Sequence, residues 1–335
     1  DNATDAEHTL SVFQTFAVVL RSAPVYPAFG NHETGSSDAP TQTGPYFDAF
    51  TLPTAAEAGG VASGTEAHYS FDYGNVHFVI LASADSDRSV GGDMYLWLEA
   101  DLMANTKDWL IAAWHHPPYT KGSHNSDSGT NEIQMRENFI PLLEDFGVDL
   151  VLAGHSHAYE RSMLIDGHYG SSSTLSGAHI VDGASGDPNG SGAYLKPSGS
   201  VPHMGGIFAV VGSSSRLSGV GNLDHPVMVR NFREFGSGII DIAGNTLNMR
   251  FLDDADQVLD EFEVVKEIAC DDGIDNDGDG LIDLLDPGCV DSSDLSEDDT
   301  AVALPMDSLP LRLVLVVALL GSGMMLRRVR SARRP

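Results

Sequence analysis

The feature of this sequence that most constrains its fold is an alternation of apolar runs with helical patterns. The runs 76–81 (VHFVIL) and 109–114 (WLIAAW) predict strands, and apolar residues recur at helical spacing over 94–103 between them. An amphipathic pattern over 131–146 predicts a helix, and the run 148–153 (VDLVLA) predicts the next strand. Strands that alternate with helices indicate an α/β fold, in which polar residues that follow the strands gather at one edge of a sheet.

The pattern changes in the second half of the body. From His179 to Lys266 the sequence shows short apolar runs that are separated by glycine-rich turns. We expect these runs to add β-structure to the same domain, which then covers residues 1–266. The predicted strands lie at 206–211, 238–242, 247–251 and 261–265.

Three polar clusters carry the chemistry of this domain. They are Gly30-Asn31-His32-Glu33, the segment 114–119 (WHHPPY) with His124 beyond it, and the segment 154–161 (GHSHAYER). Imidazole, amide and carboxylate groups are ligands of Zn, Fe and Mn. Two histidines at i and i+2 can each face one of two adjacent metals, and such a pair can hold a phosphoryl group and acidify a water.

Each cluster taken alone has a plainer interpretation, as a turn, a polar loop or a structural His-x-His. Their occurrence together and in this order, each behind an apolar run, favours a metal centre. We expect the glycines before Asn31 and His155 to let the backbone turn sharply toward the site. Histidines without a second ligand type nearby in the sequence are expected to be structural: His68, His77, His179 and His203.

The three clusters resemble consecutive motifs of the calcineurin-like metallophosphoesterases, most closely their bacterial purple-acid-phosphatase-like branch. The resemblance continues through 167–170 (GHYG), 192–197 (GAYLKP) and 224–226 (DHP) to about residue 266. It implies a four-layer α/β/β/α sandwich. It also implies hydrolysis of phosphomonoesters by attack of a metal-bound hydroxide, as in an acid phosphatase.

The resemblance also implies the roles of individual residues. Asn31, His115 and His155 bind one metal and His157 binds the other, the pair being divalent or trivalent ions of Fe, Zn or Mn. His32 and His124 face the phosphate, where they stabilise charge or protonate the leaving oxygen. Three neighbours are expected to stay outside the ligand set, namely His116, Glu160 and Arg161.

The sequence departs from the family pattern at its beginning. The first family motif is absent, and the second, Gly-Asp-x-x-Tyr, is represented only by Asp1-Asn2-Ala3 with no tyrosine at position 4. Asp1 is either the carboxylate that bridges the two metals or an ordinary terminal residue. We therefore expect no purple iron–tyrosinate centre, one tightly and one weakly bound metal, and impaired hydrolysis.

The net charge of the chain limits the classes of partner that it can bind. The chain has 48 acidic and 18 basic residues and a net charge of −30, which argues against a nucleic-acid polymer because phosphate backbones are bound by Lys and Arg. A small phosphoester is the expected substrate. Two alternatives stay open: a phosphodiesterase or nucleotidase, and a non-catalytic surface-anchored protein that keeps the fold for binding.

Residues 267–299 form an acidic module without a basic residue. Oxygen-bearing side chains at positions 1, 3, 5, 9 and 12 of a loop, with glycine at 6 and a carbonyl at 7, are typical of a calcium site. Cys270 and Cys289 bracket the loop and can close it with a disulfide, which would imply an oxidising compartment. The alternative is a solvated acidic linker. The expected Ca²⁺ ligands are Asp275, Asp277, Asp279, Leu281, Asp283 and Asp286.

Residues 300–335 form a tail with an apolar stretch and terminal arginines. The stretch 313–326 carries no charge, and arginines follow it. Counted from Leu309 it reaches 18 residues, close to the ~20 that a membrane-spanning helix needs. The arginines would stay cytoplasmic, so we expect an extracytoplasmic, cell-surface or secreted protein with a C-terminal membrane anchor. The alternative is a buried helix, and the oligomeric state stays open.

Overall fold

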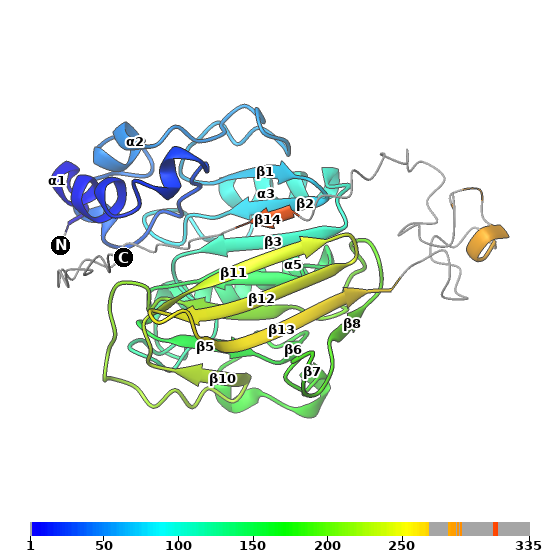
Figure 1. Ribbon diagram of the computed structural model, residues 1–335. Helices are drawn as coiled ribbons and strands as arrows, with labels where there is room; N and C mark the ends of the chain where they lie inside the picture. Colours follow the sequence, from blue (N-terminus) through cyan, green and yellow to red (C-terminus); the bar gives the residue numbers. More distant parts are fainter. Residues whose placement is uncertain (1, 268–280, 286, 288, 290–310, 314–335) are drawn as a thin grey trace, which may run out of the picture.

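The computed structural model describes residues 2–267, 281–285, 287, 289 and 311–313, which build a mixed α/β fold around two stacked sheets (Figure 1). The first sheet has seven strands, of which β2, β3, β4 and β9 are parallel neighbours. In spatial order its strands are β1 (Tyr69–Tyr73), β2 (Val76–Ile80), β3 (Trp109–Trp114), β4 (Leu150–Ala153), β9 (Ile207–Val211), β5 (Tyr159–Ser162) and β10 (Met228–Phe232).

The second sheet stacks on the first. Its three long strands, β11, β12 and β13, largely alternate between buried and half-buried residues, because one face packs against the first sheet. In spatial order its strands are β14 (Leu311–Leu313), β11 (Gly236–Ala243), β12 (Thr246–Asp253), β13 (Val258–Lys266) and β8 (Tyr194–Lys196). A separate two-stranded sheet pairs β6 (Leu164–Ile165) with β7 (Ile180–Asp182).

Helices pack against the first sheet and surround its edges. The α-helices are α1 (Asp5–His8), α2 (Pro45–Ala49), α3 (Asp93–Ala104), α4 (Thr130–Gln134) and α5 (Ile140–Asp145). Two π-helical segments are η1 (Thr9–Gln14) and η4 (Met135–Phe139). The 3₁₀ turns are η2 (Val19–Arg21), η3 (Glu33–Gly35), η5 (Ser172–Thr174), η6 (Gly177–His179) and η8 (Asp283–Leu285).

The strands expected from the sequence are present in this arrangement. The run 109–114 is fully buried as β3, and 76–81 and 148–153 contain β2 and β4. Buried parallel strands need continuous apolar runs, which explains why these segments were recognisable. Of the predicted four layers, the described residues show helices, first sheet and second sheet, with no helix over the outer face of β11–β13 (Figure 1).

The predicted helix over 131–146 is a continuous helical segment with a local defect. It comprises α4, η4 and α5, and the π-helical η4 ends at Phe139, two residues before Pro141. Proline has no N–H to donate to the preceding turn, so the regular hydrogen-bond ladder is interrupted there.

The predicted membrane anchor needs correction. No helix in the described part of the chain is long and apolar enough to cross a bilayer. Within the tail, Leu311–Leu313 instead form β14, which pairs antiparallel with the edge of β11 and so satisfies its backbone groups in a sheet. The prediction of a transmembrane helix, and the extracytoplasmic, membrane-anchored localisation that depended on it, is therefore wrong for the described residues. The rest of the tail lies outside them.

Most of the acidic module also lies outside the described residues. Leu281 is exposed, and Asp283–Leu285 form η8. The calcium loop and the disulfide to Cys289 therefore stay predictions. The members of that prediction that fall outside the described residues are Asp275, Asp277, Asp279, Asp286 and Cys270.

A buried carboxylate ties the two sheets together. Asp149, just before β4, lies 2.7 Å from Nζ of Lys196 on β8 and 2.9 Å from Nζ of Lys266 on β13. The backbone N–H of Leu110 in β3 also donates to its Oδ2, at 2.9 Å. All three charged side chains are buried, so each depends on the others for compensation.

A second buried ion pair also links the first sheet to the second. Arg161 on β5 donates to Asp260 on β13 at 2.6 and 2.9 Å, and the hydroxyl of Tyr159 donates to the same carboxylate. These contacts fix the register of the first sheet against the second.

Replacing Asp149 tests the contribution of its ion pairs with Lys196 and Lys266 to stability. Asp149→Ala leaves two buried ammonium groups without a counter-charge, so we expect a loss of about 3–5 kcal/mol in the free energy of unfolding. Urea denaturation followed by circular dichroism measures it. Asp241, which pairs with Arg250 in a partly exposed position, is the control, and Asp241→Ala should cost less than about 1 kcal/mol. Equal losses in the two variants would contradict the account.

His77 predicts a pH dependence of stability. Its ring on β2 lies 2.8 Å from Asp101 of α3 and 2.7 Å from Asp72 of β1, and Lys107 faces Asp72 at 3.7 Å. Burial by itself lowers the pKa of His77, but the hydrogen bonds and charges of Asp101 and Asp72 outweigh burial and raise the pKa above 6.5.

Because the folded-state pKa is raised, the stabilisation from His77 is complete below about pH 6.5 and is lost as the pH rises through the folded-state value. We therefore expect the difference in unfolding free energy between the wild type and His77→Gln to shrink from pH 6 to pH 9. Urea denaturation of both proteins over this range measures it. A difference that stays constant over the range would show that the ring is not charged in the folded protein.

Candidate metal centre

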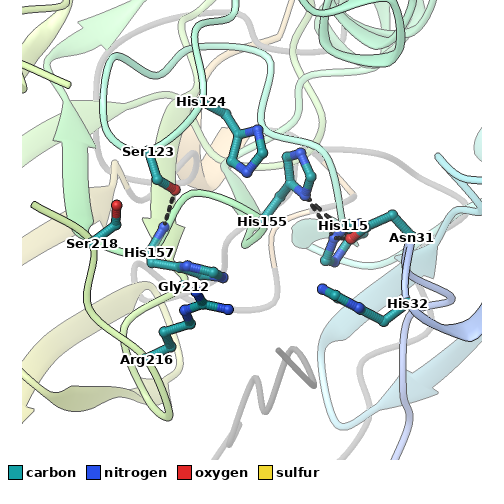
Figure 2. Close-up of a pocket in the computed structure, with 10 residues that line it drawn as sticks. All are labelled: Asn31, His32, His115, Ser123, His124, His155, His157, Gly212, Arg216 and Ser218. Carbon is teal, nitrogen blue, oxygen red and sulfur yellow. Dashed lines mark hydrogen bonds between the residues drawn. The ribbon is translucent and has the colours of Figure 1, made fainter. Parts of the chain in front are cut away.

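A pocket of about 310 Å³ opens where parallel strands end (Figure 2). His115 directly follows β3, Gly212 directly follows β9, and His155 lies two residues after β4. This is the carboxyl edge of the sheet, where open α/β folds place their sites. The pocket is lined by Asn31, His32, His115, Ser123, His124, His155, His157, Gly212, Arg216 and Ser218.

Three of these side chains meet at one point. Nε2 of His115 lies 2.6 Å from Oδ1 of Asn31 and 3.0 Å from Nδ1 of His155. Nδ1 of His155 lies 3.3 Å from the same Asn31 oxygen. Ligands with bonds of about 2.1 Å to one ion are themselves about 3 Å apart at right angles and about 3.4 Å apart in a tetrahedron. The donor set and its spacing therefore fit a borderline transition metal.

The protonation states suit this role. Burial is the largest cause that lowers the pKa of His115 well below its usual range, and the neighbouring histidines add to it. Burial, followed by the charges of His116 and other rings, lowers the pKa of His155 to about 2. Both rings are neutral at physiological pH, so each offers a nitrogen lone pair to a metal.

The two glycines that precede the site residues do not act in the way that was expected from the sequence. The expected sharp turn falls on His155 itself, whose φ is +60°, and not on Gly154. Gly30 is needed for close approach: a Cβ there would lie 2.9 Å from Nδ1 of His115 and 2.7 Å from Oε2 of Glu33. Glu33 in turn accepts the N–H of Gly30 at 3.1 Å.

The remaining predicted site residues line the same pocket. The ring of His124 stacks on that of His155 with 3.6 Å between centroids. His157 lies across the pocket from Asn31, beside Arg216, and its backbone N–H donates to Ser123 (Figure 2). Burial and then Arg216 lower the pKa of His157 to about 4.

His32 comes from the same loop as Asn31, and Figure 2 shows its ring facing the cavity. Burial is the largest cause that lowers its pKa. Asp1 lies outside the described residues, so its role as a bridging ligand stays a prediction.

Residues expected to stay outside the ligand set have other partners. The ring of His116 contacts Oγ of Ser83 at 2.9 Å and Nδ2 of Asn131 at 3.3 Å, which engages both nitrogens. Glu160 is buried, accepts the hydroxyl of Thr120 and accepts the N–H of Lys121 at 3.0 Å. Glu160 thus braces the loop that carries His124.

Two charged residues of the site were not predicted from the sequence. Arg216 enters the pocket from the loop that follows β9. It could have been found, because it follows an apolar run as the three clusters do. Glu132 lies 3.6 Å from Nε2 of His155, and burial raises its pKa. No sequence signal connects Glu132 to a histidine in another cluster.

Comparisons with known proteins agree with this geometry. The calcineurin-like phosphoesterase family matches residues 4–159. Purple acid phosphatase 23 of Arabidopsis thaliana is 39% identical over 39% of this chain and 28% of its own length. Purple acid phosphatase 18 of the same plant is 33% identical over 48% and 36%.

A solved structure of a purple acid phosphatase from yellow lupin (Lupinus luteus) seeds aligns with 65% of this chain and 39% of its own, at 20% identity and a TM-score of 0.45. The chain spans about a third of the length of the curated relatives named above. The matched segment contains Asn31, His115, His155 and His157, so the part of the chain that builds the pocket is similar to the calcineurin-like phosphoesterases, and purple acid phosphatases are among its relatives.

Proposed function

We propose that this protein is a metal-dependent phosphoesterase that hydrolyses small phosphomonoesters in the pocket of Figure 2. The observation that carries the proposal is the meeting of Asn31 Oδ1, His115 Nε2 and His155 Nδ1 within 3.3 Å of one another. An amide oxygen and two neutral imidazoles in this arrangement are a ligand set for Zn, Mn or Fe. When bound, such ions polarise the phosphoryl group and acidify water.

The two proposed metal positions differ in the number of described side chains that could bind an ion there. Three side chains, Asn31, His115 and His155, serve the first position. His157, on the opposite wall, is the described residue that would serve the second. We therefore expect the first ion to be held more tightly than the second.

The remaining pocket residues would bind and orient the substrate. Arg216 brings a guanidinium group to the wall that carries His157, and it can pair with phosphate oxygens. His32 and His124 face the same cavity from two other loops, where they can donate hydrogen bonds to the phosphate or a proton to the leaving oxygen (Figure 2). A cavity of this size favours a small substrate.

Substrate turnover tests the reaction class. The protein is assayed with p-nitrophenyl phosphate and with bis-p-nitrophenyl phosphate after loading with Zn²⁺, Mn²⁺ or Fe²⁺. We expect slow turnover of the monoester, and a loss of at least about 100-fold in kcat/KM for His155→Ala, because it removes a metal ligand. His179→Ala, outside the pocket, is the control and should keep full activity.

The alternatives give different results in the same assay. Faster turnover of the bis-ester would replace the monoesterase by a phosphodiesterase. No turnover of either ester by a protein whose metal content is verified would instead indicate a non-catalytic binding protein.

Gly30→Ala should weaken metal binding without removing a ligand. The added Cβ would displace the ring of His115 or the carboxylate of Glu33, so we expect about a 10-fold or greater loss of affinity for Zn²⁺. Competition with a fluorescent chelator measures this affinity. Gly177→Ala is the matched control, because a Cβ at Gly177 meets no atom within 4 Å. Unchanged affinity in Gly30→Ala would mean that the packing around Gly30 does not position His115.

A further inference from the structure

Three side chains of types that can bind a metal lie close together at the opposite edge of the first sheet. Glu144 lies near the end of α5, Asp166 follows β6, and His203 precedes β9. One potential ligand atom from each lies within 4.8 Å of the others. Glu144 and His203 precede the parallel strands β4 and β9, whereas His155 and Gly212 follow them. A five-residue strand is about 16 Å long, so this cluster is separate from the phosphoesterase pocket.

Glu144 has an oxygen that the protein leaves without a partner. The side chain is only 2% exposed. Its Oε2 accepts the hydroxyl of Tyr169 at 2.6 Å and the N–H of Gly167 at 2.9 Å. Its Oε1 is buried and has no hydrogen-bond partner. A buried carboxylate oxygen without a partner is costly, and a bound cation would compensate it.

His203 is oriented as a metal ligand usually is. Its Nδ1 lies 3.2 Å from Oδ1 of Asp166, and its Nε2 lies 2.9 Å from Oδ1 of Asp145. Metal-binding histidines commonly use one nitrogen for the ion and donate the other N–H to a carboxylate. The arrangement leaves Nδ1 for an ion shared with Asp166 and assigns Asp145 to the orienting role.

The backbone of His203 supports this interpretation. Its φ is +59°, a conformation that non-glycine residues rarely adopt and that is often found where a side chain must be aimed. Its N–H donates to the carbonyl of Glu144 at 3.0 Å, which holds two of the three side chains in register. The His203 side chain is 49% exposed, so water can reach the site and complete the coordination.

We propose that Glu144, Asp166 and His203 form a second metal site for a divalent first-row cation such as Zn²⁺ or Mn²⁺, with Asp145 orienting His203. One imidazole and two carboxylates suit such ions. The bound ion links the end of α5, the segment after β6 and the segment before β9. The site does not depend on the proposed hydrolytic function.

Zinc binding by the full chain tests the site. The His155→Ala background weakens the phosphoesterase pocket, and zinc content is measured after dialysis against a weak chelator. We expect the His155→Ala protein to retain one more Zn²⁺ per chain than either double variant, His155→Ala/His203→Ala or His155→Ala/Glu144→Gln. Because Glu144→Gln alters a buried position, the half-exposed His203→Ala is the decisive variant. Equal zinc content with and without His203 would overturn the proposal.

Two further variants distinguish a metal site from an ordinary ion-pair cluster. Asp145→Asn should weaken zinc binding about 10–100-fold, as expected for a group that orients a ligand. Glu137→Gln, which removes an exposed carboxylate from η4, is the matched control and should leave binding unchanged. Zn²⁺ should also raise the melting temperature of the His155→Ala protein but not of His155→Ala/His203→Ala. An equal rise in both would contradict the site.

Discussion

The candidate site of this protein depends on three lone-pair donors that occupy a space suited to one ion. Asn31, His115 and His155 come from three different loops, and their donor atoms lie within 3.3 Å of one another. Neutral imidazoles at this spacing gain little from each other, because each ring has a single N–H to donate. A metal ion that binds all three donor atoms would satisfy their lone pairs. The other histidines of the pocket and Arg216 surround this position.

The sheets supply the precision that such a site needs. The parallel register of β3, β4 and β9 brings the loops that follow them to the same edge. Asp149 fixes β4 to the second sheet through Lys196 and Lys266, and Arg161 with Asp260 does the same for β5. These ion pairs are buried, and they contribute to a single arrangement of the two sheets as much as to the free energy of unfolding.

Much of this could be predicted from the sequence. Buried parallel strands are continuous apolar runs, so β3 was predicted with its observed bounds, and the clusters that follow strands were expected to share an edge. The cluster of Glu144, Asp166 and His203 could not be found this way, because its members come from segments far apart in the chain and none follows one of the strands predicted from the sequence. Nor did the apolar tail indicate β14, since pairing with β11 depends on an open sheet edge that only the fold reveals.

The most direct test of the central claim is an anomalous difference map from a crystal of the zinc-loaded protein. The account predicts a zinc peak within about 2.0–2.2 Å of Asn31 Oδ1, His115 Nε2 and His155 Nδ1. A map without density there at saturating zinc, with these three side chains still in contact with one another, would contradict it.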